Sequence, residues 1–124
     1  GKGATMSETL YDRLGGEAGI SAIAKDTINN HLINPKIMVR FQGADTAKLH
    51  QLVVEFFGMG SGGPQKYSGR DMKEAHRKMN INEEEFVAVI DDALKALDKN
   101  KIDGATKNEV LGILYSLKAD IIRL

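Results

Sequence analysis

The sequence predicts a single all-α domain, and three features support this. Apolar residues recur at the i, i+3, i+4 spacing of amphipathic helices, and no segment alternates apolar and polar residues with the two-residue period of a strand. Glycines cluster at Gly15-Gly16 and from Gly58 to Gly63, between the periodic stretches, where helices commonly end. The length of 124 residues suits one domain. We assign that domain to residues 7–124 and interpret Gly1 to Thr5 as the remnant of an expression tag.

The expected helices are read from their apolar faces and from the residues that end them. Gly15-Gly16 ends a short first helix, and Asn34-Pro35 ends the second, because proline disfavours a helical conformation in the residue before it. A brief helical turn over Pro35 to Arg40 leads to Phe41. The apolar faces, in chain order, are Leu10, Tyr11 and Leu14; Ile20, Ile23, Ala24, Thr27 and Ile28; Leu49, Leu52, Val53 and Phe56; Phe86, Val89, Ile90, Ala93, Leu94 and Leu97; and Val110, Ile113, Leu114, Leu117 and Ile121.

Capping residues predict where the later helices begin. Asp45 is a plausible cap for the third long helix, and Asp71 for a short helix that carries His76. Two capping boxes are expected before the last two helices, formed by Asn82 with Glu85 and by Thr106 with Glu109. Between these helices, Gly58 to Gly69 reads as a glycine-rich loop of unusual length, and such loops are often functional.

Composition excludes several classes of protein. The 17 acidic and 17 basic residues are spread along the chain, so we expect no nucleic-acid partner. No apolar run approaches the ~20 residues of a membrane span, so we expect no membrane association. The absence of cysteine excludes disulfides and thiolate ligands and fits a cytoplasmic location. The run from Gly58 to Pro64 lacks the G-K-[ST] ending of a phosphate-binding loop.

The candidate chemistry lies in three histidines, His31, His50 and His76. None has the spacing of a site with several protein ligands, but a haem iron needs only one, because the porphyrin supplies four. His76 suits that role, since it shares an apolar helix face with Met72, and its second ring nitrogen could donate to a carbonyl one turn back. The alternative is a structural histidine. Carboxylates such as Asp91-Asp92 and Glu83 to Glu85 are interpreted as solvated or helix-terminal charge.

One further pattern spans nearly the whole chain. The order Leu10-Tyr11…Leu14-Gly15-Gly16, Phe41, Glu55-Phe56 and Tyr67-Ser68-Gly69-Arg70-Asp71-Met72…Ala75-His76 resembles the group I truncated haemoglobins. The resemblance implies a two-over-two helical sandwich around haem b, iron protoporphyrin IX, and we expect the chain to be a monomer. His76 matches the proximal iron ligand, Phe41 a phenylalanine that stacks on the haem, and Phe57 a phenylalanine that gates an apolar tunnel. The other implied haem contacts are Lys48 and Tyr67, as candidates for the propionates, and Leu49, Leu52, Val53, Phe56, Met72, Met79, Ile81, Phe86 and Val89.

The departures from the family pattern concern the side on which gas would bind. The family usually has a tyrosine where this chain has Ile28, and often a glutamine where it has Val53. The predicted distal pocket, formed by Ile28, Leu49, Leu52, Val53 and Phe57, therefore offers no hydrogen-bond donor. We expect oxygen to be held ~10–100-fold more weakly than by a tyrosine-bearing relative. A one-residue register shift near Gly43 would instead put His50 at the position of Leu49, within reach of the iron.

Three functions remain open from the sequence. The resemblance favours reversible binding of oxygen, carbon monoxide or nitric oxide, for storage, transport or sensing. A second possibility is a haem enzyme, which would turn over nitric oxide by dioxygenation or react with peroxide, with an external reductase as partner. The third is a globin-like interaction domain without haem, which a haem absorption band would exclude.

Overall fold

The prediction of an all-α chain is confirmed by the computed structural model, which describes residues 8–123. The interpretation of Gly1 to Thr5 as a tag remnant falls outside these residues. The described part contains α1 (Leu10–Arg13), α2 (Gly16–Ile33), η2 (Met38–Phe41), α3 (Thr46–Gly60), α4 (Met72–His76), α5 (Glu83–Lys99), α6 (Gly104–Ser116) and η3 (Lys118–Asp120). Within it, extended pairing is limited to an isolated bridge between Ile81 and Ile122.

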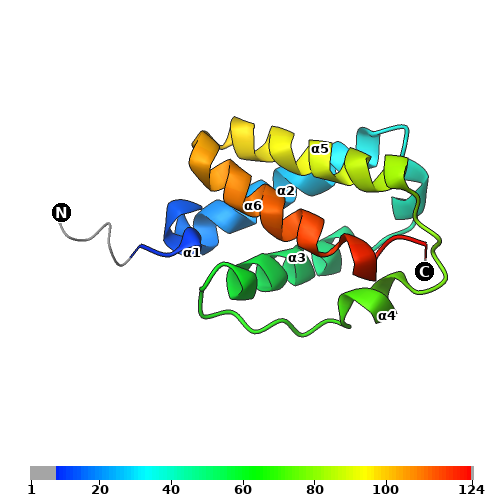
Figure 1. The fold of residues 1–124 in the computed structure, drawn as a ribbon, viewed down its shortest axis with the longest axis horizontal. Coiled ribbons are helices and arrows are strands. Elements are labelled where there is room, and N and C mark those ends of the chain that lie inside the picture. The colour runs from blue at the N-terminus through cyan, green and yellow to red at the C-terminus, as the bar shows by residue number, and fades with distance from the viewer. Residues whose placement is uncertain (1–7, 124) are drawn as a thin grey trace.

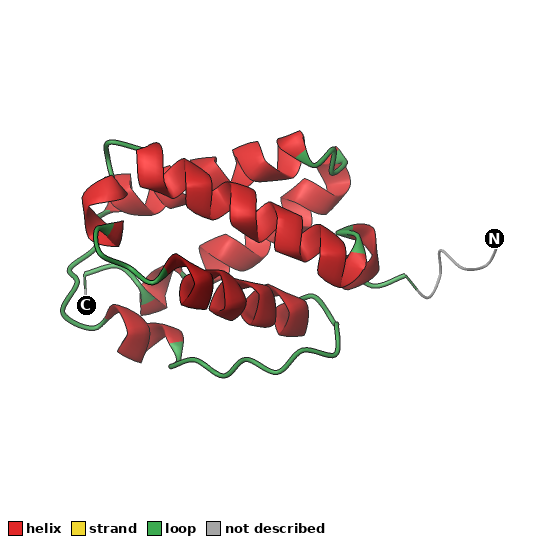
Figure 2. Ribbon diagram, turned by 180° about the vertical axis from the view of Figure 1, so that it is seen from behind, coloured by secondary structure: helices red, strands yellow, loops and turns green. Residues whose placement is uncertain are grey.

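The long helices form two pairs that pack on each other. α2 packs against α3 and also against α5, α6 packs against α5, and short α1 contacts both α2 and α6 (Figure 1). This is the expected two-over-two arrangement. After α3, the loop 61–71 runs along that helix and returns the chain to α4, as the reverse view in Figure 2 shows. The loop therefore places α4 at the far end of α3, beside the chain's C-terminal segment.

Local hydrogen bonds fix most helix starts where the sequence predicts them. Asp45 accepts from the Lys48 amide at 3.1 Å, and Asp71 accepts from the Glu74 amide at 2.9 Å. Asn82 and Glu85 form the reciprocal capping box that the sequence predicts. At the junction of α1 and α2, Gly15 has φ 94°, a left-handed conformation that side-chain-bearing residues rarely adopt. These boundaries follow from short-range chemistry.

Two predicted boundaries are wrong. The last long helix is capped by Asp103, whose carboxylate accepts from the Thr106 amide at 2.8 Å, rather than by Thr106. Thr106 lies one turn inside α6 and is completely buried, and Glu109 pairs with Arg13 instead of closing a capping box. The glycine-rich loop begins at Ser61, not at Gly58, because α3 continues through Gly60.

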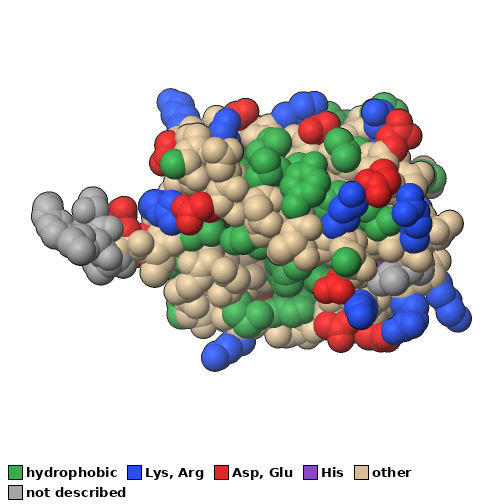
Figure 3. Space-filling model, viewed as in Figure 1, with side chains coloured by type: hydrophobic (Ala, Val, Ile, Leu, Met, Phe, Trp, Pro, Cys, Tyr) green, Lys and Arg blue, Asp and Glu red, His purple; other side chains and the backbone are tan. Residues whose placement is uncertain are grey.

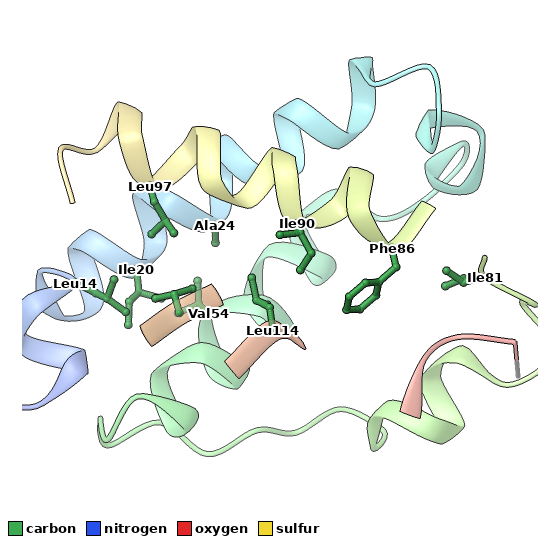
Figure 4. Packing of buried hydrophobic residues seen from close by; sticks show 10 residues of the cluster. Leu14, Ile20, Ala24, Val54, Ile81, Phe86, Ile90, Leu97 and Leu114 are labelled. Carbon is green, nitrogen blue, oxygen red and sulfur yellow. The ribbon is translucent and has the colours of Figure 1, made fainter. Parts of the chain in front are cut away.

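The core contains residues from all the long helices and underlies the region around α4. It comprises Leu14, Ile20, Ala24, Val54, Ile81, Phe86, Ile90, Leu97, Val110 and Leu114. Figure 4 shows Phe86 and Ile90 extending from α5 toward the side on which α3 and α4 lie. α5 therefore presents an apolar surface to the helix that carries His76.

The C-terminal segment fastens the stretch that follows α4. η3 packs against α4, and the Arg123 amide donates to the Ile81 carbonyl at 2.9 Å. Lys118 pairs with Glu83 at 2.7 Å, at the first turn of α5. The stretch 77–82, between His76 and α5, is thus fixed by the C-terminal segment at Ile81 and, just after it, at Glu83.

The surface agrees with the balanced composition. Acidic and basic side chains are interspersed over the face shown in Figure 3. No helix within residues 8–123 is long and apolar enough to cross a membrane.

Candidate functional site

His76, the last residue of α4, has one ring nitrogen engaged and the other available. Nδ1 lies 2.8 Å from the Met72 carbonyl oxygen. Because a carbonyl can only accept, Nδ1 must carry the proton, which leaves the lone pair on Nε2. Neutral imidazole in this tautomer is a good metal ligand. The hydrogen bond that the sequence predicted, one turn back along the helix, is therefore present.

The residues predicted to contact the haem are mostly only partly covered. Ile81 and Phe86 are buried, whereas Lys48 is exposed. The remaining predicted contacts are half-buried: Phe41, Leu49, Leu52, Val53, Phe56, Phe57, Tyr67, Met72, Met79 and Val89. Half-exposed apolar side chains suit contact with a flat apolar cofactor, and the Nε2 atom of His76 could serve as its protein ligand. The residues present thus fit a porphyrin with one protein ligand.

The face of α3 that follows the predicted distal spacing is uniformly apolar. Leu49, Leu52, Val53 and Phe56 share it, and Ile28 on α2 is buried. His50 points elsewhere, since its Nε2 lies 2.9 Å from the Ser21 carbonyl and donates to it. The His50 ring is therefore turned toward α2 and is already engaged there.

An aromatic cluster and Glu55 attach the long loop to α3. Phe56 makes edge-to-face contacts with Phe57 and Tyr67, at centroid distances of 5.5 and 5.3 Å. The Tyr67 hydroxyl donates to the Arg70 carbonyl at 2.6 Å, so that proton is already used within the loop. Glu55 accepts from the Ser68 hydroxyl and amide, which lower the pKa of its carboxyl.

Comparison with known proteins identifies the family. The model of the family described as "Bacterial-like globin" matches residues 9–123. This chain is a bacterial-like globin. The Group 1 truncated hemoglobin of Tetrahymena pyriformis is 27% identical over 115 residues, which cover 93% of the globin and 95% of that relative. The Group 1 truncated hemoglobin of Synechocystis sp. is 33% identical over 93 residues, 72% of the globin and 75% of the relative.

Solved structures agree with the fold. The truncated hemoglobin of Tetrahymena pyriformis, solved in its Fe(III) form, aligns with a TM-score of 0.91 at 26% identity, covering 94% of the globin and 100% of that chain. The Group II truncated hemoglobin of Bacillus anthracis aligns with a TM-score of 0.85 at 19% identity, over 94% and 92% of the two chains. The resemblance to truncated haemoglobins and the two-over-two fold are thereby confirmed.

Sequence reasoning missed a buried polar group in this globin. The sequence predicts a solvated Asp92, but Asp92 is 2% exposed, and its Oδ2 lies 2.8 Å from Nδ1 of His31, which is 7% exposed. Asn34 donates to both Asp92 oxygens, at 3.1 and 3.2 Å, and Asn30 donates to the Asp92 carbonyl at 3.0 Å. The available signal was spacing: position 92 lies one turn from Ala88 and Ala96, small residues suited to a packed face.

The same buried pair contacts Phe41. The His31 ring stacks on the Phe41 ring at a centroid distance of 5.2 Å and an interplanar angle of 17°. Burial lowers the pKa of His31 and outweighs the opposing effect of Asp92, so we treat the imidazole as neutral at neutral pH. Arg40, the residue before Phe41, forms a two-point ion pair with Glu85 of α5.

The stability of the folded globin should fall as pH drops below 6.5. The pKa of His31 is lowered in the folded state from its ordinary 6.5. Below that pH the unfolded chain therefore binds a proton that the folded chain does not bind, which favours the unfolded state. The loss should reach up to about 1.4 kcal/mol per pH unit until the lowered pKa is passed. Urea unfolding at pH 7.5, 6.5 and 5.5 measures it.

The control for this pH dependence is the double variant His31→Leu/Asp92→Leu, which removes the imidazole without leaving a buried carboxylate unpaired, and its unfolding midpoint should vary less over the same range. Ordinary carboxyl pKa values are about 4, below the pH range of this experiment, so the comparison reports on the imidazole rather than on carboxylates. Equal pH slopes for the wild type and the variant would contradict the assignment to His31.

Proposed function

We propose that this globin binds haem b, iron protoporphyrin IX, with His76 as the axial ligand, and reversibly binds a diatomic gas on the opposite side. The observation that carries the proposal is the free Nε2 of His76 on a half-exposed apolar surface, with its Nδ1 proton donated to the Met72 carbonyl. Membership of the globin family supports it, as does the Fe(III) form in which the Tetrahymena pyriformis relative was solved.

When bound, haem supplies an iron atom with a vacant position for oxygen, carbon monoxide or nitric oxide. His76 would contribute the lone pair of Nε2. The hydrogen bond from Nδ1 to the Met72 carbonyl fixes the plane of the ring and makes Nε2 a stronger electron-pair donor to a metal. Met72, Met79, Ile81 and Phe86 are the apolar residues that we expect to cover the haem on this side.

On the other side, the side chains that we expect to line the gas pocket are hydrocarbon. No hydrogen-bond donor or acceptor is present in the side chains of Ile28 on α2 or of Leu49, Leu52 and Val53 on α3. Phe57, also on α3, packs against the core. Such a lining admits small apolar molecules and gives no proton donor for oxygen chemistry. This lining favours reversible gas binding over enzymatic turnover with an external reductase.

Hemin titration of the purified globin tests the proposal. We expect saturation at one hemin per chain, an intense Soret band, and a carbonyl complex after reduction. The ferric spectrum should show one protein ligand, because His50 is committed to the Ser21 carbonyl. A protein that stayed colourless with added hemin would refute haem binding. A low-spin ferric form with two histidines would refute the open gas site, and rapid consumption of nitric oxide by the oxygenated protein would favour the enzyme.

A further inference from the structure

The pair His31–Asp92 is a buried polar cluster to which the proposed function gives no role. Both Asp92 oxygens accept hydrogen bonds, from His31 and from Asn34, so the carboxylate is fully partnered although it lies between α2 and α5. A buried pair of this kind is a poor means of gaining stability, since apolar residues of similar volume often serve as well. Its rigid geometry is therefore the more informative property.

The series of contacts that includes this pair ends at Phe41. Asn34 holds the Asp92 carboxylate, Asp92 holds the plane of the His31 ring, and His31 stacks nearly parallel on one face of the Phe41 ring. Phe41 closes η2 and is itself half-exposed, so its second face is not covered by the core. The Arg40–Glu85 ion pair anchors the preceding residue to α5. The plane of Phe41 is thus set from α2 and α5 together.

We propose that His31 and Asp92 are positioning residues, which orient the Phe41 ring so that its free face lies flat against the porphyrin. This inference rests on the proposed haem function. In this proposal the pair affects haem retention indirectly, through the orientation of Phe41. Neither His31 nor Asp92 needs to touch the haem. Removing the imidazole frees the ring to tilt, and a tilted ring loses parallel contact with a flat partner.

A double-mutant cycle on haem loss tests this route. Rates of haem transfer to a scavenger protein are measured for wild type, His31→Leu, Phe41→Leu and the double variant, all loaded with hemin. In the presence of Phe41, His31→Leu should speed haem loss by about three- to tenfold, the range expected of an aromatic stack. In the Phe41→Leu background the same substitution should change the rate by less than about 1.5-fold, because contacting residues couple and independent ones do not. Equal effects in both backgrounds would overturn the proposal.

Two further variants separate positioning from loss of stability. His31→Leu with Asp92→Leu leaves no unpaired buried charge, so it should fold even where His31→Leu alone does not, and it should still lose haem three- to tenfold faster. Thr106→Val removes a buried hydroxyl from α6, far from Phe41 in the fold, and should lower stability without changing haem loss. A Thr106→Val effect as large as that of His31→Leu would overturn the proposal.

Spectroscopy adds a readout that does not depend on rates. Nitrogen NMR of His31 in the hemin-loaded globin should show a protonated Nδ1 and an unprotonated Nε2, and Asp92→Leu should abolish the Nδ1 hydrogen bond. A wild type that takes up no hemin would overturn the proposed function and this inference with it. A wild type with normal uptake and no coupling between His31 and Phe41 would overturn this inference alone.

Discussion

Replacing His76 with leucine should abolish axial ligation and weaken hemin binding by more than about 100-fold. Loss of an outer partner of a metal ligand typically costs 10- to 100-fold in metal affinity, and here the ligand itself is removed. Leucine retains the apolar bulk at the end of α4, so the Asp71 cap and the fold should persist. Hemin titration followed at the Soret band, with circular dichroism to confirm helix content, measures the result.

The matched control for this variant is His50→Leu, which removes an imidazole whose Nε2 donates to the Ser21 carbonyl. Hemin affinity and the ferric spectrum should remain those of the wild type. As a complement, His76→Gly should regain axial ligation when free imidazole is added. Ligation that survived in His76→Leu would contradict the assignment of His76.

Substituting Ile28→Tyr should slow oxygen dissociation by about 10- to 100-fold. The tyrosine hydroxyl would supply the hydrogen-bond donor that the apolar lining lacks, and such bonds to polar or charged partners contribute about 1.5–3 kcal/mol. Carbon monoxide is less polar when bound, so its dissociation should change much less. Flash photolysis and stopped-flow displacement provide both rates.

Ile28→Phe controls for the volume of the added ring at this buried position. It carries the same ring without the hydroxyl, so any effect of crowding appears in both variants and the donor effect appears only with tyrosine. Equal oxygen dissociation rates for the tyrosine and phenylalanine variants would contradict the proposed location of Ile28 on the gas side.

Features set by neighbours in sequence were predictable, and features set by distant partners were not. Asp45, Asp71 and the Asn82–Glu85 box act within three residues, so the sequence alone locates those helix starts. At the start of α6 the sequence predicts Thr106 as the cap, whereas the structure has Asp103, three residues earlier, and buries Thr106.

The candidate site divides in the same way. The hydrogen bond from His76 to Met72 spans one helical turn and could be expected from the sequence. The partner of Asp92 lies 61 positions away, and that of His50 lies 29 away, so neither burial nor orientation could be read from local pattern. A carboxylate on a helix is solvated by default, and only the packing of α2 on α5 reverses that expectation here.

The attachment of Arg123 and Ile122 to Ile81 has a consequence for biosynthesis. A polypeptide leaves the ribosome from its N-terminus, and His76 emerges well before the residues that brace the stretch behind it. Residues 77–82 gain their contacts with Ile122 and Arg123 only after that later part of the chain has been made. The stretch between α4 and α5 can therefore reach its folded conformation only after α5 and α6 have also been synthesised.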